Sequence, residues 1–224
     1  MPDMRRVPIA ILASTSLALV LPAAAPATLS EVGVIGSTSP ATVPSCPGSP
    51  CLAVSRTTGF QVKVGKVRSP EIVPREGSIV AWTITLGKPN ATQIKFFNTN
   101  EGGPSEAGIA ILRPQKKPNL TYKLIAQSPL IKLEPYFGKS AQFPLATTIK
   151  VKKGDVVALT VPSWAPALAL GFGNDTSWRA SRPKTGCSTT SSQTDHTQLN
   201  TNVQYFCLYQ TARLTYSATL ISTP

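Results

Sequence analysis

The expected fold follows from one stretch near the end of the chain, Arg213-Leu-Thr-Tyr-Ser-Ala-Thr-Leu220. Leu214, Tyr216, Ala218 and Leu220 alternate there with polar residues. Because successive side chains of a β-strand point to opposite faces, this pattern predicts a strand with one face on a core and the other in water.

Similar runs recur through the chain, separated by Pro, Gly, Asn and Asp clusters that are typical of turns. We expect further strands at residues 60–64, 78–86, 92–97, 108–112, 122–126, 148–151, 156–161 and 167–170. Lys152-Lys-Gly-Asp155 is expected to form a tight turn between two of them. No segment predicts an amphipathic helix. Many short strands of this kind favour an all-β fold, a single antiparallel β-sandwich that is jelly-roll-like, with an immunoglobulin-like sandwich as the alternative.

Composition agrees with a folded β-domain. The chain has 224 residues, of which 42% are hydrophobic and only 14% charged. This balance disfavours a helical bundle, a coiled coil and wholesale disorder. We assign the sandwich to residues 57–224, a length that can bury a real core.

Residues 1–27 have the three parts of a secretory signal peptide. Arg5 and Arg6 form a basic head, residues 7–21 are an apolar run, and small residues follow. We place the cleavage site before Thr28. An uncleaved anchor is the alternative, but the apolar run is shorter than the roughly 20 residues that a spanning helix needs. We therefore expect a secreted or cell-surface protein with no stable membrane span after cleavage.

The cysteine pattern fits an exported protein. There are four cysteines, an even number that predicts disulfides in this context. A Pro-Gly turn separates Cys46 from Cys51, and a polar stretch separates Cys187 from Cys207, so we expect Cys46–Cys51 and Cys187–Cys207 bridges. The first bridge would pin residues 28–56, which we interpret as a loose Pro/Ser/Thr-rich arm. The cysteines lack the spacing of a zinc site, and we expect no metal and no cofactor.

Three segments carry a resemblance: Val73-Pro-Arg-Glu-Gly-Ser-Ile-Val-Ala-Trp-Thr-Ile84, Ala110-Ile-Leu-Arg-Pro114 and Phe143-Pro-Leu-Ala-Thr-Thr-Ile-Lys-Val-Lys-Lys-Gly-Asp-Val-Val-Ala-Leu159. Over about residues 60–220, the chain resembles a group of secreted actinobacterial β-sandwich proteins. The shared motifs are strands and turns, so the resemblance implies the sandwich and no activity.

Catalytic constellations are weak. His196 is the single histidine, beside Asp195 in a polar stretch, and we expect a solvated loop residue there rather than a catalyst. The acid pairs Glu71/Glu76 and Glu101/Glu106 lie in turn-like segments, where we expect them in water and not in a glycosidase cleft.

Aromatic residues on proline- and asparagine-containing loops are the candidate ligand site. Trp164 and Trp178 could stack on sugar rings, with Asn174 and Arg179 bonding the hydroxyl groups. The alternative is that both tryptophans pack internally, and Trp82, on a predicted strand, is expected in the core.

The formal net charge is +12. The lysines and arginines are dispersed along the sequence, which argues against nucleic-acid binding and suits attraction to a polysaccharide or an anionic cell-wall polymer. The sequence therefore predicts a secreted, non-enzymatic surface or binding module for cell-wall or environmental glycans. A secreted polysaccharide or ester hydrolase and a structural envelope protein are the alternatives, and the pattern does not predict an oligomeric state.

Overall fold

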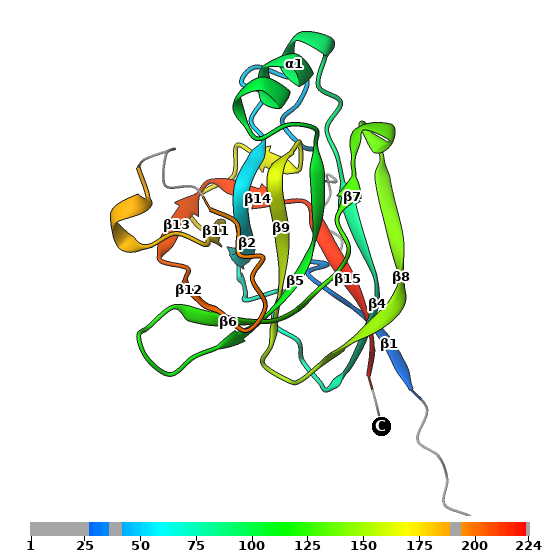
Figure 1. Cartoon of the computed structure of the whole chain (residues 1–224), viewed down its shortest axis with the longest axis vertical. Helices are drawn as coiled ribbons and strands as arrows, with labels where there is room; N and C mark the ends of the chain where they lie inside the picture. Colours follow the sequence, from blue (N-terminus) through cyan, green and yellow to red (C-terminus); the bar gives the residue numbers. More distant parts are fainter. Residues whose placement is uncertain (1–26, 36–41, 189–193, 223–224) are drawn as a thin grey trace, which may run out of the picture.

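Two curled antiparallel sheets pack against each other in this protein (Figure 1). The computed structural model describes residues 27–35, 42–188 and 194–222. The expected all-β sandwich is confirmed. The expected signal peptide, residues 1–27, lies outside the described residues except for Ala27.

The smaller sheet, which we call sheet A, has four strands in the order β1-β15-β4-β8. Their bounds are Thr28–Val32 for β1, Tyr216–Ser222 for β15, Gly77–Thr85 for β4 and Ser140–Val151 for β8. All three pairings are antiparallel.

The larger sheet, sheet B, follows the order β12-β6-β5-β9-β2-β11-β13, with β3 paired to β2 and β7 to β5. Its strands are β2 Val54–Val64, β3 Val67–Arg68, β5 Glu106–Pro114, β6 Thr121–Gln127, β7 Ile131–Lys132, β9 Val156–Ala165, β11 Ser177–Ala180, β12 Asn202–Gln204 and β13 Cys207–Gln210. A separate two-stranded ladder joins β10 Leu168–Leu170 to β14 Ala212–Leu214. Short 3-10 helices occupy Glu134–Tyr136 and Lys184–Gly186.

The eight principal strands are paired in a nested order. In chain order they are β1, β2, β4, β5, β6, β8, β9 and β15. The first pairs with the last (β1 with β15), the second with the seventh (β2 with β9), the third with the sixth (β4 with β8) and the fourth with the fifth (β5 with β6). This nesting is that of a long ribbon folded over itself, so the topology is that of a jelly roll rather than an immunoglobulin-like sandwich.

A long insertion separates the last two principal strands. Residues 166–215 leave the end of β9 and return to β15, and they contain β10 to β14. They extend sheet B beyond β2 through β11 and β13, and beyond β6 through β12. Tyr205 from the insertion joins Phe60, Leu112 and Leu124 in a second hydrophobic core. The insertion therefore covers part of the face of sheet B that points away from sheet A.

The main core lies between the two sheets. Sheet A contributes Trp82, which is 1% exposed, together with Ile79 and Ile84, and sheet B contributes apolar residues of β5 and β9. The expectation that Trp82 is a core residue is confirmed. Trp164, at the end of β9, is also fully buried.

The polar face of β15 differs from expectation. Ser217 and Thr219, predicted to face water, are both buried. Their hydroxyl groups donate hydrogen bonds to the carboxylate of Glu31 on the neighbouring strand β1, at 3.2 and 2.5 Å. Alternation predicts the strand correctly, but it does not reveal that a side chain from an adjacent strand covers the polar face.

The expected strand at residues 92–97 is wrong, because these residues belong to helix α1, Ala91–Asn100. A capping box starts the helix. The Asn90 side chain accepts from the Gln93 backbone N–H at 2.9 Å, and the Gln93 side chain accepts from the Asn90 N–H at 2.8 Å. The helix turns Phe97 inward, where its ring stacks on Trp164 with centroids 4.7 Å apart.

The expected loose arm at residues 28–56 is wrong for its two ends, which lie in strands. Its beginning is strand β1, the first strand of the jelly roll, and its end belongs to β2. The backbone N–H of Ser45 donates to Leu168 O at 2.9 Å, and Val32 and Cys46 are buried. The sequence analysis did not predict this strand because the segment has few large apolar residues. Its main-chain hydrogen bonds to β15 add the edge strand of sheet A.

Both expected disulfides are present. Cys46 is bonded to Cys51, and Cys187 to Cys207, with S–S distances of 2.02 and 2.06 Å. The second bridge ties the start of β13 to the preceding loop of the insertion.

Replacement of either buried tryptophan should destabilise the whole fold. We expect Trp82→Ala and Trp164→Ala each to lower the free energy of unfolding by about 3–5 kcal/mol, because both changes leave a large cavity. Urea unfolding of the two variants measures this. Phe96→Ala is the matched control on α1, since its ring is 57% exposed. A Trp164→Ala variant as stable as Phe96→Ala would contradict the core assignment.

Candidate functional site

The structure does not support an aromatic platform at Trp164. Its ring is 0% exposed and is enclosed by Phe97 and Phe137. Its indole N–H donates to Asn98 Oδ1 at 2.8 Å and to Gly103 O at 3.0 Å. A ring that is buried in this way has no face free for a sugar, so the packing alternative holds for Trp164.

Trp178 is also buried, and the four expected ligand residues do not converge. Trp178 lies on β11 at 6% exposure, over Gly59, where a Cβ would come within 2.9 Å of the indole ring. Arg179, the next residue, donates to the backbone oxygens of Phe206 at 2.7 Å and Tyr205 at 3.2 Å. Asn174 is exposed in the turn before β11. Adjacent strand residues face opposite ways, so Trp178 and Arg179 serve different surfaces.

His196 is a buried structural residue and not the solvated loop residue expected. It is 2% exposed, with Nδ1 3.0 Å from the Tyr205 hydroxyl group and Nε2 3.1 Å from Thr201 Oγ1. Its backbone N–H donates to Thr58 Oγ1 on β2 at 2.9 Å. Burial lowers the pKa of His196, which favours the neutral ring. The histidine therefore fastens the insertion to sheet B.

Glu71 also differs from expectation. It is 2% exposed and does not lie in water. Its carboxyl group packs against Gly33, where φ is +91° and an added Cβ would collide with Glu71 Oε2. That oxygen has no hydrogen-bond partner among the described residues. Burial raises the pKa of Glu71 well above its usual value, and the positive charge of Arg213 only partly opposes this effect. The carboxyl group thus keeps its proton at pH values where an exposed glutamate has lost it.

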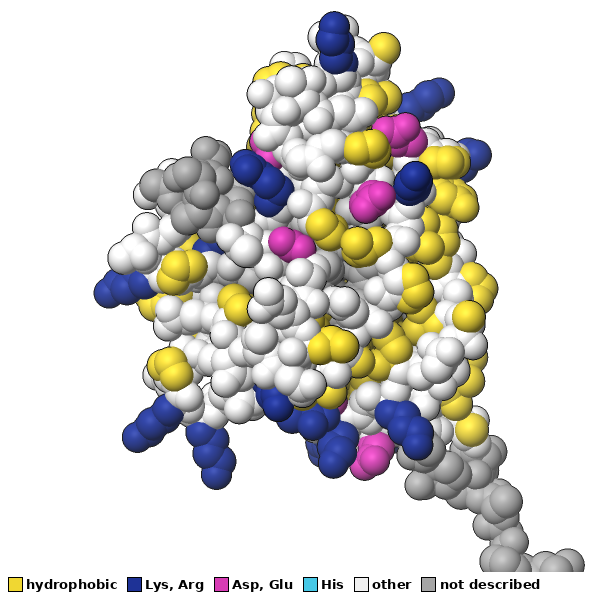
Figure 2. All heavy atoms as spheres, in the orientation of Figure 1, with side chains coloured by type: hydrophobic (Ala, Val, Ile, Leu, Met, Phe, Trp, Pro, Cys, Tyr) yellow, Lys and Arg dark blue, Asp and Glu magenta, His cyan; other side chains and the backbone are white. Residues whose placement is uncertain are grey.

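Cations gather at one end of the sandwich, which is lowest in Figure 1. The strand register brings three loops to this end, because Gly77 pairs with Val151, Leu112 with Val156, and Pro114 with Tyr122. Figure 2 shows the dark-blue side chains concentrated there. We call this surface the basic lower end; by this register it consists of Arg75, Arg113, Lys116, Lys117, Lys123, Lys150, Lys152 and Lys153.

One buried carboxylate organises the basic lower end. Asp155 is 2% exposed, and it accepts two hydrogen bonds from Arg113, at 2.8 and 2.9 Å, and one from the Lys152 backbone N–H at 2.8 Å. The bond to Asp155 raises the pKa of Arg113. The expected tight turn at 152–155 is thereby confirmed, and it holds Lys152 and Lys153 outward, where both are exposed.

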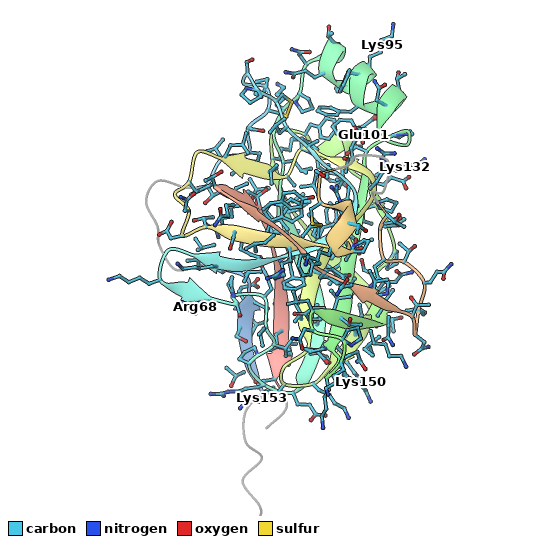
Figure 3. The ribbon with its side chains drawn as sticks, turned by 90° about the vertical axis from the view of Figure 1, so that its left-hand side faces the viewer. Arg68, Lys95, Glu101, Lys132, Lys150 and Lys153 are labelled. Atoms are coloured by element: carbon cyan, nitrogen blue, oxygen red, sulfur yellow. A yellow bond between two sulfur atoms is a disulfide. The ribbon has the colours of Figure 1, made fainter. Side chains whose placement is uncertain are left out.

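A second loop is bonded to this turn. The Val73 backbone N–H donates to Asp155 O at 2.8 Å, and the Gly154 N–H donates to Val73 O at 2.9 Å. These bonds place Arg75 beside the lysines of the turn. Lys150 lies just before the turn on β8, opposite Ser78 of β4 (Figure 3).

Cations outnumber acids in these loops. The basic lower end has eight lysines and arginines, whereas its loops carry two acids, Asp155, which is engaged by Arg113, and Glu76. Cations from separate loops, fixed on a hydrogen-bonded frame, produce a positive potential that attracts anions with several charges. The basic lower end could not be predicted from the sequence, because its lysines and arginines are spread between positions 75 and 153 and are brought together only by the strand register.

No protein-family model, curated protein or solved structure matches this chain. None of the helices in the described ranges is long and apolar enough to cross a membrane. What the protein binds therefore has to be inferred from its own side chains.

Glu71 should make the stability of the protein depend on pH. The folded state holds a proton on Glu71 that the unfolded chain releases near pH 4.5, so this group lowers the free energy of unfolding as the pH rises above 4.5, by at most about 1.4 kcal/mol per pH unit. His196, whose pKa burial lowers, acts in the opposite direction below about pH 6.5. Glu71→Gln carries a neutral amide and should lose only the Glu71 contribution, so the free energy of unfolding of the wild type should fall with pH relative to that of the variant.

Urea unfolding at pH 5, 6 and 7 measures the effect. Glu134→Gln, which changes an exposed carboxylate, is the control and should keep the wild-type slope. Parallel pH dependences for the wild type and Glu71→Gln would show that Glu71 is not the group responsible.

Proposed function

We propose that this protein is an extracellular, non-enzymatic binding module that attaches through its basic lower end to an anionic polysaccharide or a similar cell-wall polymer. The observation that carries the proposal is the convergence of eight cations on one end of the jelly roll, with the Asp155–Arg113 contact as their frame.

The arrangement suits a polymer better than a single small anion. The cations come from the loops 73–76, 115–120 and 152–155 and from the strands beside them, so they are spread over the whole end of the sandwich. A polyanion can contact several of them at once and release many counterions, which adds up weak individual attractions. Arg113 and Lys123 also lie directly opposite each other on β5 and β6. Asp155 already neutralises Arg113, so Lys123 is the member of this pair that is left for an external anion.

An extracellular location is supported by the two disulfides, which are typical of oxidising compartments. Cleavage before Thr28 is supported by the start of β1 at that residue. Thr28 pairs with Ser222, which in turn pairs with Gly77, so the new N-terminus would lie at the basic lower end. Its amino group would add a further positive charge there.

Mass spectrometry of secreted material tests the processing. We expect a chain that begins at Thr28 and takes up no alkylating reagent until a reductant is added, because all four cysteines are bonded. An intact Met1 would contradict cleavage, and alkylation without reductant would contradict the bridges.

Binding to dextran sulfate, compared with uncharged dextran, tests the polymer proposal. The wild type should bind only the sulfated polymer, and more weakly as NaCl rises. A variant with Lys150, Lys152 and Lys153 changed to Gln should lower the slope of log affinity against log [NaCl] by roughly 2, since each contact to a dense polyanion contributes a little under one unit.

A matched variant distinguishes an effect of the basic lower end from an effect of the overall net charge. Changing Lys88, Lys95 and Lys139 to Gln removes the same charge from exposed positions at the opposite end of the sandwich. Lys88 and Lys139 lie just beyond the Thr85–Ser140 pair of β4 and β8, and Lys95 lies on α1 (Figure 3). This variant should bind nearly as the wild type does. Equal losses in the two triple variants would mean that the overall charge, and not the basic lower end, governs binding.

A further inference from the structure

A hollow of about 420 Å³ lies on the outer side of sheet A, away from the basic lower end. Its floor is formed by Thr83 and Thr85 of β4 and Ser217 of β15, and the segment Gly33–Ile35 forms one wall. Arg213 of β14 lies at its edge. Its volume falls within the range of small-molecule sites, and its lining is unusually rich in hydroxyl groups.

Arg213 is a cation without a charged partner. Its guanidinium group donates to Thr42 Oγ1 at 2.9 Å, and it forms no ion pair within the described ranges. Glu71 is the acid that acts on it electrostatically. Glu71 Oε2 is buried against Gly33 and has no hydrogen-bond partner among the described residues, so the guanidinium group of Arg213 is not in contact with this carboxyl group.

The remaining polar groups suit a hydroxylated ligand. Thr83 makes no side-chain hydrogen bond with any described residue, so its hydroxyl group is available to a ligand. The Ser217 hydroxyl group donates to Glu31 and can still accept a hydrogen bond from a ligand hydroxyl group. Val34 supplies apolar surface in the same hollow. The site therefore has a cationic end at Arg213 and hydroxyl groups at Thr83 and Ser217.

We propose that this hollow binds one carboxylate-bearing sugar, with its carboxylate on Arg213 and its hydroxyl groups towards Thr83 and Ser217. A guanidinium group can hold a carboxylate through two parallel hydrogen bonds, which gives both affinity and orientation. The site is separate from the basic lower end and does not depend on the polymer proposal.

Calorimetric titration with sodium glucuronate tests the proposal, with glucose as the uncharged counterpart. We expect glucuronate to bind the wild type at least about tenfold more tightly than glucose, as the loss of a charge-assisted hydrogen bond implies. Arg213→Gln should weaken glucuronate binding by about tenfold or more. Arg75→Gln removes the same charge from the basic lower end and should leave binding within about twofold.

Two further variants keep the result interpretable. Thr83→Val preserves the shape of an existing strand residue and should weaken glucuronate binding several-fold, even if Arg213→Gln proves unstable. The variant lacking Lys150, Lys152 and Lys153 should bind glucuronate as the wild type does, so failure of one proposal does not imply failure of the other. The proposal is overturned if glucuronate does not bind, if inorganic phosphate binds more tightly than glucuronate, or if Arg75→Gln and Arg213→Gln lose equal affinity.

Discussion

Strands β5 and β9 are apolar on both faces, and the rest of the architecture follows from the need to cover both. Ile109 and Ile111 of β5 point into the core shared with sheet A, while Ala110 and Leu112 point the other way. Exposing either set would cost on the order of 1.5–3 kcal/mol for each large side chain. Sheet A covers one face, as in any jelly roll, and the insertion between β9 and β15 covers the other. The burial of His196 and Tyr205 is a consequence of this second layer, and so is the Cys187–Cys207 bridge that fastens it.

Two buried acids, Asp155 and Glu71, have opposite surroundings. Asp155 is buried but receives three hydrogen bonds, through which it holds the loops of the basic lower end. Glu71 is buried without such donors, and burial raises its pKa well above the usual value. A carboxylate with partners connects the loops that carry surface lysines, whereas a carboxyl group without partners leaves the nearby Arg213 without an ion pair among the described residues. Both proposed binding surfaces therefore depend on what surrounds a single buried acid.

The two proposed surfaces are suited to different kinds of anion. The basic lower end offers many exposed cations without a cavity, which favours a polymer of repeating charge and gives little selectivity for its residues. The hollow beside Arg213 offers one cation among hydroxyl groups, which favours a single ligand unit of defined shape. Both lie on a scaffold whose rigid strands, and not its loops alone, position the functional side chains.

The sequence by itself determined the all-β class, most of the strands, both disulfides, the 152–155 turn and the core position of Trp82. These features depend on local alternation, turn chemistry and cysteine spacing, which neighbouring residues express directly. Tertiary structure alone decided the rest. Residues 92–97 form a helix because Asn90 and Gln93 cap it and Phe97 packs on Trp164, and the polar segment 28–32 forms a strand because β15 offers it an edge. The sequence left open whether Trp164 and Trp178 are buried, and it predicted neither the burial of His196 and Glu71 nor the meeting of distant lysines at one end, because burial and charge density are set by contacts between residues far apart in the chain.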